Sequence, residues 1–167
     1  MDVFAAIEKR ASVRAFAPGA VPHEHLMEIL DAGRRAPSAY NYQSYEFIAV
    51  NDRALLKELA QVQDCLAEAA VAFVVVAQKC KFCGEDAAAA VENMLLAATA
   101  LGYGSLWIES YLLTSEPRVQ AILGVPEERR IAAIVAIGRA IGPARQADKK
   151  PLAQIVHWNR FGQRTME

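Results

Sequence analysis

Cysteine is scarce in this sequence: 167 residues contain three, Cys65, Cys80 and Cys83. Three cysteines at such uneven spacing exclude the disulfide framework that is typical of small secreted domains. Cys80 and Cys83 form a single CxxC pair, and a four-cysteine metal site would need ligands from elsewhere. We interpret the pair as two ordinary thiols, with a redox dithiol or a metal site as less favoured alternatives. A reducing cytoplasm fits this cysteine content best.

Long apolar runs and an excess of charge of one sign are also missing. The longest apolar run, residues 69–77, is far shorter than the ~20 residues that span a bilayer. Charges at Asp2 and at residues 8–10 leave no room for a signal peptide. Lys and Arg number 18 against 19 Asp and Glu, a net charge of -1. We therefore expect neither a membrane nor a nucleic acid as partner.

The sequence also lacks linkers, internal repeats and the common hydrolase and kinase motifs. We therefore expect one domain over residues 1–167, with a core built from its 54% hydrophobic residues. No GxSxG, HExxH, Walker A loop or spaced carboxylate dyad occurs. His23 and His25, two residues apart, would point to different sides of a helix, so we predict no metal site. These absences argue against a hydrolase or a kinase, so the chemistry must be carried in another way.

Hydrophobic periodicity predicts helices interleaved irregularly with strands. We expect helices over residues 2–10, 22–36, 55–59, 86–101 and 115–123, with Asp2 and Asp86 as N-caps and Gly102 as a left-handed stop. Extended segments are expected at residues 12–16, 45–50, 72–77, 105–111 and 131–137. This spacing is too irregular for repeated βαβ units, so we predict an α+β fold with a mixed sheet.

Two permanent cations and a hydroxyl, those of Arg10, Ser12 and Arg14, alternate along one predicted extended segment. At the strand period all three point the same way. Because guanidinium groups pair with phosphate by two parallel hydrogen bonds, the pattern is typical of an anion clamp. A solvated basic stretch is the alternative that the residues alone leave open.

Residues 36–47 form an unusual loop that opens with Pro37 and contains three tyrosines, hydroxyls and amides. Such a composition can line a pocket for a flat heteroaromatic ligand, or it can be a turn whose tyrosines cover the core.

The glycines of the segment Gly102-Tyr-Gly104 end a helix and lead into a strand. That order excludes a dinucleotide-binding loop, which follows a strand and opens a helix.

Five segments in order resemble the FMN-dependent nitroreductase family: Arg10-Ala-Ser-Val-Arg14, Ala36-Pro-Ser-Ala-Tyr-Asn-Tyr-Gln43, Asn93 in an Ala-rich helix, Leu101-Gly-Tyr-Gly-Ser-Leu-Trp-Ile-Glu109, and Ile137-Gly138 with Lys149-Lys-Pro-Leu152. The resemblance implies a nitroreductase-like α+β fold with a central mixed or antiparallel sheet flanked by helices. It also implies a homodimer with the Ala-rich helix at its interface and FMN as the cofactor. The implied activity is ping-pong transfer of hydride from NAD(P)H, through flavin N5, to a nitroaromatic, quinone or similar acceptor.

The same resemblance assigns roles to individual residues. Arg10 and Lys149 would hold the FMN phosphate, Ser12 the ribityl chain, and Arg14 the pyrimidine edge, where a cation favours reduced flavin. Pro37, Ser38 and Asn41 would come from the partner subunit, Gln63 would contact the ring edge, and backbone N–H groups near Glu109 and Ser110 would face N5 and O4. No side chain would be catalytic.

The sequence departs from the family pattern at a few positions, and two other functions stay open. Ser44-Tyr45 replaces a common Pro-Trp, Ser110 stands where glycine is usual, and Ala147 stands where Lys is frequent, which leaves Arg145 as a further phosphate contact. One alternative is a flavin-binding or electron-transfer module, acting through the CxxC pair without NAD(P)H oxidase activity. The other is an interaction domain that pairs through its Ala-rich helix.

Overall fold

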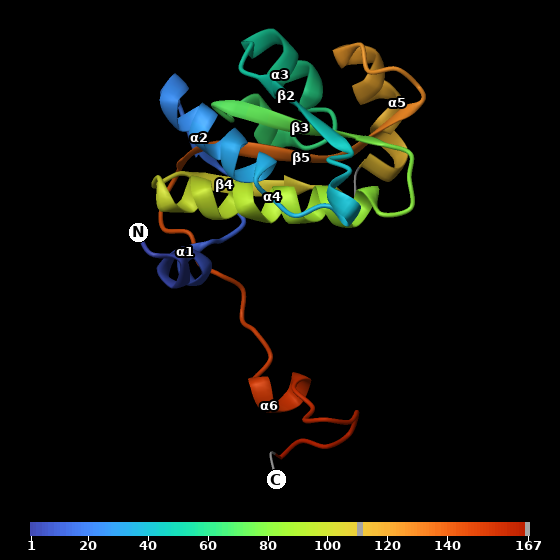
Figure 1. Ribbon diagram of the computed structural model, residues 1–167. Coiled ribbons are helices and arrows are strands. Elements are labelled where there is room, and N and C mark those ends of the chain that lie inside the picture. Colours follow the sequence, from blue (N-terminus) through green and yellow to red (C-terminus); the bar gives the residue numbers. More distant parts are fainter. Residues whose placement is uncertain (110–111, 166–167) are drawn as a thin grey trace.

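The computed structural model describes residues 1–109 and 112–165, apart from the side chain of Leu113 (Figure 1). Its helices are α1 (Val3–Lys9), α2 (His23–Arg34), α3 (Arg53–Leu59), α4 (Cys83–Ala100), α5 (Leu112–Leu123) and α6 (Leu152–Ile155), with 3-10 turns η1 (Ala39–Asn41) and η2 (Asp64–Ala67). Its strands are β1 (Phe16–Ala17), β2 (Tyr45–Val50), β3 (Val71–Gln78), β4 (Gly104–Ile108) and β5 (Arg129–Ala140).

The strands form one sheet in the order β1-β5-β3-β2, with β4 also paired to β5. Every strand pair is antiparallel, and an isolated parallel bridge joins Ser12 to Ser105. β3 lies inside the sheet and is apolar along almost its whole length, as a strand buried on both faces requires. The predicted α+β class with a central, largely antiparallel sheet is confirmed.

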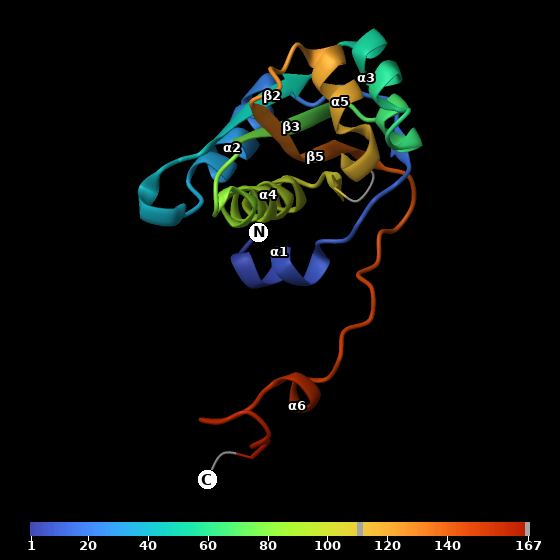
Figure 2. The same cartoon turned by 90° about the vertical axis from the view of Figure 1, so that its right-hand side faces the viewer.

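Helices cover both faces of the sheet (Figures 1 and 2). Val74 of β3 belongs to the core beneath α3 and α5, whereas Phe73 and Val75 belong to the core beneath α2 and α4. Successive strand residues point to opposite faces, so one strand anchors both layers. α1 packs against α4 on the side away from the sheet.

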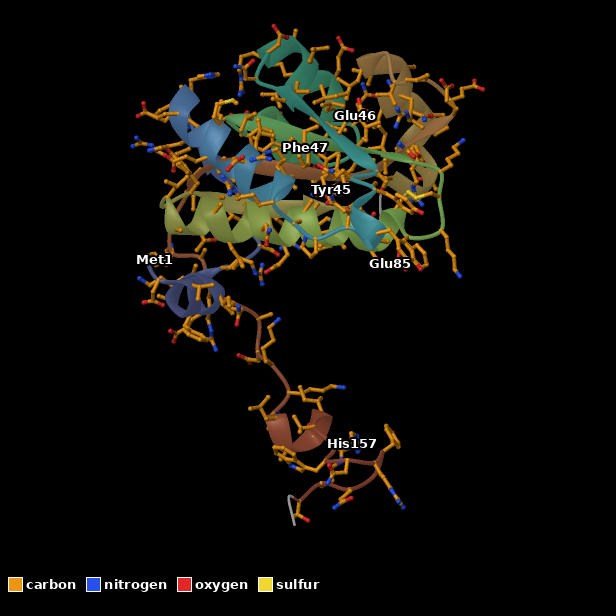
Figure 3. All side chains as sticks on the ribbon, viewed as in Figure 1. Met1, Tyr45, Glu46, Phe47, Glu85 and His157 are labelled. Atoms are coloured by element: carbon orange, nitrogen blue, oxygen red, sulfur yellow. A yellow bond between two sulfur atoms is a disulfide. The ribbon has the colours of Figure 1, made fainter. Side chains whose placement is uncertain are left out.

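The C-terminal segment leaves the body after β5 and extends away from it, carrying α6 (Figures 1 and 3). Its large apolar side chains are exposed: Leu152, Ile155, Trp158 and Phe161, the last with 94% of its surface accessible. Phe4 of α1 is also 80% exposed. Within the described ranges, no helix is both long and apolar enough to cross a bilayer.

The expected boundaries need correction at α4. The sequence predicted that Asp86 caps this helix, but α4 begins at Cys83 and Phe82 occupies the N-cap position. Asp86 lies in the first turn, where its buried carboxylate binds groups outside the helix instead. The other end agrees with prediction, since Gly102 follows the helix with φ of 86°, a left-handed conformation that suits glycine.

Candidate functional site

Residues 10–14 form the extended segment that links α1 to β1. Ala11 and Val13 are buried, whereas Ser12 and Arg14 are exposed and the Arg10 side chain is 20% exposed. The Val13 N–H donates to the Ser105 carbonyl across 2.9 Å, which fixes the segment beside β4. The predicted alternation is confirmed, and it presents Ser12 and Arg14 on the outer side.

Two glycines let this segment approach the sheet closely. A Cβ on Gly104 would lie 2.8 Å from a methyl carbon of Val13, and one on Gly138 would lie 2.9 Å from the Phe16 ring. Val13 and Phe16 are both buried, so making room for such a Cβ would require these side chains and the segment that carries them to shift. Glycine at 104 and 138 therefore sets the distance between the Arg-bearing segment and the strand pair β4–β5.

A cavity of about 290 Å³ lies along this segment. It is lined by Ser12 and Arg14 on one side and by residues 140–145, including Arg145, on the other. The Gln146 side chain donates to the carbonyls of Ile7 and Arg10, at 3.0 and 3.1 Å. Gln146 thereby fixes the beginning of the C-terminal segment against the end of α1, next to Arg10.

Cations outnumber carboxylates around this cavity. Arg10 has Glu92 at 3.9 Å, and Arg145 pairs with Asp148 at 3.0 Å. Arg14 and Lys149 form no ion pair with any residue in the described ranges. A cavity lined by Arg145 and by the unpaired guanidinium group of Arg14 suits a phosphate or other anion.

Gln63 lies two residues before Cys65, whose thiol is buried. Burial raises the pKa of Cys65, and the positive charge of Arg14 acts in the opposite direction. The half-buried Gln63 is not among the residues that line the cavity.

The loop with Pro37, Ser38 and Asn41 has an unusual backbone. Tyr40, Asn41 and Gln43 all have positive φ, between 48° and 58°. Such conformations cost roughly 1 kcal/mol or more for residues other than glycine, so surrounding contacts must hold them. Asp86 supplies two of these contacts, accepting hydrogen bonds from the Ala39 N–H at 2.8 Å and the Ser44 hydroxyl at 2.9 Å.

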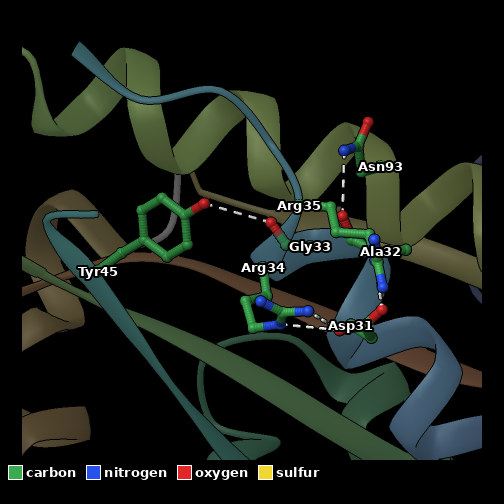
Figure 4. Close-up of polar contacts among 7 residues, drawn as sticks. All are labelled: Asp31, Ala32, Gly33, Arg34, Arg35, Tyr45 and Asn93. Atoms are coloured by element: carbon green, nitrogen blue, oxygen red, sulfur yellow. Dashed lines mark hydrogen bonds and ion pairs between the residues drawn. The ribbon is translucent and has the colours of Figure 1, made fainter. Parts of the chain in front are cut away.

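The three tyrosines of this loop have different roles. Tyr40 and Tyr42 are 82% and 67% exposed, whereas Tyr45 is buried. The Tyr45 hydroxyl donates to the Gly33 carbonyl across 3.2 Å (Figure 4). Tyr45 belongs to the core beneath α2 and α4, and it also lines a cavity of about 360 Å³ together with Gln43 and Phe47.

Within one chain, this loop and the Arg-bearing segment lie on different sides of α4. The view along α4 shows the loop projecting on one side and residues 10–16 on the other (Figure 2). No residue of the loop lines the cavity beside Ser12 and Arg14. The structure therefore does not bring Pro37, Ser38 and Asn41 to Arg10 in a single copy.

Glu109 is exposed at the end of β4, and Ser110 lies outside the described residues.

The sequence pattern of the Nitroreductase family matches this chain over residues 7–81 and 63–139. The chain belongs to the nitroreductase family. It is 35% identical, over 79% of its length and 82% of the relative, to an Archaeoglobus fulgidus protein with the provisional name NADH dehydrogenase/NAD(P)H nitroreductase.

Solved structures of nitroreductases share the fold. One, a nitroreductase with bound FMN from Bacteroides fragilis, is 31% identical, with a TM-score of 0.82 over 96% of this chain and 100% of that one. Another, an FMN-dependent nitroreductase from Clostridium difficile, is 30% identical, with a TM-score of 0.86 over 95% of this chain and 99% of that one.

Asn93, part of the family resemblance, has a structural position in this nitroreductase. Its side-chain amide donates to the Ala32 carbonyl at 3.0 Å, which ties α4 to the end of α2 (Figure 4). Asp31 in the same turn binds Arg34 and Arg35, and both hydrogen bonds lower the pKa of its carboxyl. These contacts fix the helix end from which the loop at Pro37 departs.

The sequence did not indicate the contacts of Gln146 with the end of α1, and it predicted Asp86 as a helix cap although its carboxylate binds the loop at residues 39–44. Gln146 follows Arg145 in a segment without periodicity, so no sequence signal marked it. The interpretation of Cys80 and Cys83 as ordinary thiols is wrong, because the two sulfurs form a disulfide. The CxxC spacing and the turn between β3 and α4 bring the two Cα atoms to 5.4 Å, a separation that suits a disulfide.

Proposed function

We propose that this nitroreductase family member is an FMN-dependent oxidoreductase that works as a homodimer, with all 167 residues in one FMN-binding domain. The observation that carries the proposal is the open cavity lined by Ser12, Arg14 and Arg145, in which Arg14 has no carboxylate partner within the described ranges. FMN bears a phosphate and a ring that becomes anionic on reduction, so this donor set fits it.

Each residue of the proposed site then binds a particular part of FMN. Arg10 and Lys149 bind the phosphate, and Ser12 donates to the ribityl chain. Arg14 faces the pyrimidine edge, where its permanent charge stabilises the anionic reduced ring, and Gln63 binds the ring edge nearby. Arg145 adds a further cation at the cavity rim. The backbone near Glu109 and Ser110 directs N–H groups toward the reactive edge.

The second half of the site comes from the partner subunit. The loop that carries Pro37, Ser38 and Asn41 lies on the other side of α4 from residues 10–16 (Figure 2), and none of its residues lines the cavity beside Arg14, so we infer that it completes the cavity of another copy. Exposed apolar side chains on α1 and along the C-terminal segment supply the area such a dimer needs. We infer that the segment with Leu152, Trp158 and Phe161 packs on the partner, and that α4 lies near the interface.

Bound FMN would supply the redox chemistry, accepting hydride from NAD(P)H at N5 and passing electrons to a nitroaromatic, quinone or similar acceptor in a ping-pong sequence. The protein binds and orients the ring, and its cations favour the reduced charge. No side chain is needed as a nucleophile. Because NAD(P)H is a cytoplasmic reductant, we infer a cytoplasmic enzyme.

Anaerobic stopped-flow absorption tests the activity. Mixing the FMN-loaded protein with NADH or NADPH should bleach the flavin in a single turnover, and adding a quinone should restore the colour. A flavin that stays oxidised with both nucleotides would instead support a flavin carrier or electron-transfer module. Dimerisation without flavin binding would support an interaction domain.

A further inference from the structure

The Cys80–Cys83 disulfide lies at the junction between β3 and α4. β3 ends at Gln78, and Cys83 is the first residue of the 18-residue helix. A dithiol pair at the start of a long helix is well placed for thiol chemistry, because unpaired backbone N–H groups and the helix dipole stabilise a thiolate there.

The two cysteine residues differ in exposure. Cys80 is exposed, whereas Cys83 is 1% exposed. An attacking thiolate from solution can therefore reach Cys80 and cannot reach Cys83. Attack on Cys80 makes Cys83 the leaving group, and Cys83 occupies the helix position where negative charge is stabilised.

A cation-lined cavity of about 440 Å³ begins at Lys79, the residue before Cys80. Arg129 and Arg130, at the start of β5, line it as well, and Glu116 is its one acidic lining residue among the described residues. Glu46 pairs with Arg129 at 3.1 Å, but Arg130 forms no ion pair within the described ranges. The surplus positive charge beside Cys80 favours a thiol that carries negative charge.

We propose that Cys80–Cys83 is a thiol–disulfide exchange site whose reductant is a small anionic thiol of the glutathione type. The thiolate attacks the Cys80 sulfur, the Cys80–Cys83 bond breaks, and Cys83 leaves as a thiolate that takes a proton from water. A second thiolate attacks the first thiol's sulfur in the mixed disulfide and releases Cys80. Two external thiols are oxidised to one disulfide, and the protein disulfide is reduced by two electrons.

The redox state of this pair also acts on the loop at residues 38–44. Asp86 follows Cys83 by three residues and holds Ala39 and Ser44 through its carboxylate. Reduction removes the covalent link between Cys80 and the first turn of α4, so the Asp86 anchor becomes less firmly fixed. If the proposed flavin site is correct, this loop is the part given to the partner subunit, but the exchange chemistry does not depend on flavin.

Single-cysteine variants test the roles of the two sulfurs. Incubated with oxidised glutathione, Cys83→Ser should retain one glutathione on Cys80, because no neighbouring thiol can displace it. Cys80→Ser should retain none until it is denatured. Intact mass and peptide mapping give the result, and buried Cys65 is the internal control. Adducts on both variants, or on neither, would overturn the proposal.

The wild-type protein gives a test that does not depend on how the variants fold. In mixtures of reduced and oxidised glutathione, the native pair should reach the same ratio of dithiol to disulfide from either starting state. Amide exchange at residues 38–44 should rise in the reduced form. A disulfide that is reduced only after denaturation would contradict the exchange site, and unchanged amide exchange would contradict its link to the loop.

Charge substitutions test the class of thiol. The ratio of the reduction rates by glutathione and by cationic cysteamine should fall roughly two- to fivefold in Arg130→Gln. Lys57→Gln, an exposed cation on α3, is the matched control and should leave the ratio unchanged. An equal ratio in wild type and Arg130→Gln would overturn the assignment of an anionic thiol.

Discussion

The buried carboxylate of Asp86 accepts a hydrogen bond from the buried hydroxyl of Ser44 across 2.9 Å. Its other oxygen accepts from the Ala39 N–H. One side chain on the first turn of α4 thereby holds both ends of a loop with three residues at positive φ. The loop proposed to complete the partner's flavin site is positioned by a helix of its own chain.

Replacing Asp86 by Ala should loosen this loop. The Ala39 N–H and the Ser44 hydroxyl would lose their partner, at a cost of about 1–3 kcal/mol. We expect faster amide exchange over residues 38–44 and weaker FMN binding. Glu85→Ala removes a neighbouring exposed carboxylate and is the matched control. Unchanged exchange in Asp86→Ala would show that the loop is held by other contacts.

Replacing Gly104 by Ala should disturb the anion-binding segment. The new Cβ would meet Val13 at 2.8 Å, and Val13 is buried and stiff, so the segment carrying Ser12 and Arg14 must move outward. We expect a loss of about 1–3 kcal/mol in unfolding free energy together with weaker FMN binding. Gly84→Ala is the control, since a Cβ there meets nothing within 4 Å. Denaturant unfolding and FMN titration measure both effects.

Removing the cations one at a time should rank their contributions. Arg10→Ala should weaken FMN retention more than Lys149→Ala, because Arg10 is largely buried and held near Gln146, whereas Lys149 is exposed. Fluorescence titration of FMN into each variant gives the dissociation constants, with Lys57→Ala as the control. Equal retention in both variants and the wild type would refute the phosphate assignment.

Stability should fall at alkaline pH, in part because of Tyr45. Burial, and then the charge of Asp86, raise the pKa of Tyr45 above its ordinary value of 10.0. The folded state therefore keeps this proton at pH values where the unfolded chain loses it, so unfolding free energy decreases as pH rises above about 10.0. Tyr45→Phe should be less stable near neutrality, yet should lose less stability above that pH. Parallel pH curves for the two proteins would contradict this role.

Polar substitutions in the C-terminal segment should weaken the dimer. Leu152→Ser combined with Phe161→Ser removes two of its most exposed apolar side chains, which should shift the protein toward monomer in sedimentation velocity. Lys150→Ser combined with Arg160→Ser is the control in the same segment. A monomeric wild type, or a double variant as dimeric as the control, would contradict the proposed packing.

Local patterns predicted much of this fold. The apolar run gave β3 within a residue or so at each end, and alternation at residues 11–14 gave the correct buried and exposed sides. The position of Asp86 was misread because a carboxylate near a helix start is usually a cap, whereas this one binds a loop 42 residues earlier. The Cys80–Cys83 bond depends on chain geometry at a turn, which spacing alone does not determine. The course of residues 143–165 lacks any periodic signal.

The site was predicted only in part for a similar reason. Ser12 and Arg14 are local in sequence, so their shared exposed side follows from the strand period. Gln146 reaches Arg10 across 136 residues, and the contribution of Pro37, Ser38 and Asn41 depends on a second copy. Neither relationship can be read from neighbouring residues.

The absorption spectrum of the purified protein, followed by identification of the flavin released on denaturation, tests the central claim most directly. We predict flavin absorption bands and close to one FMN per chain, either as purified or after incubation with FMN. A protein that is colourless and remains so after incubation with FMN would contradict it.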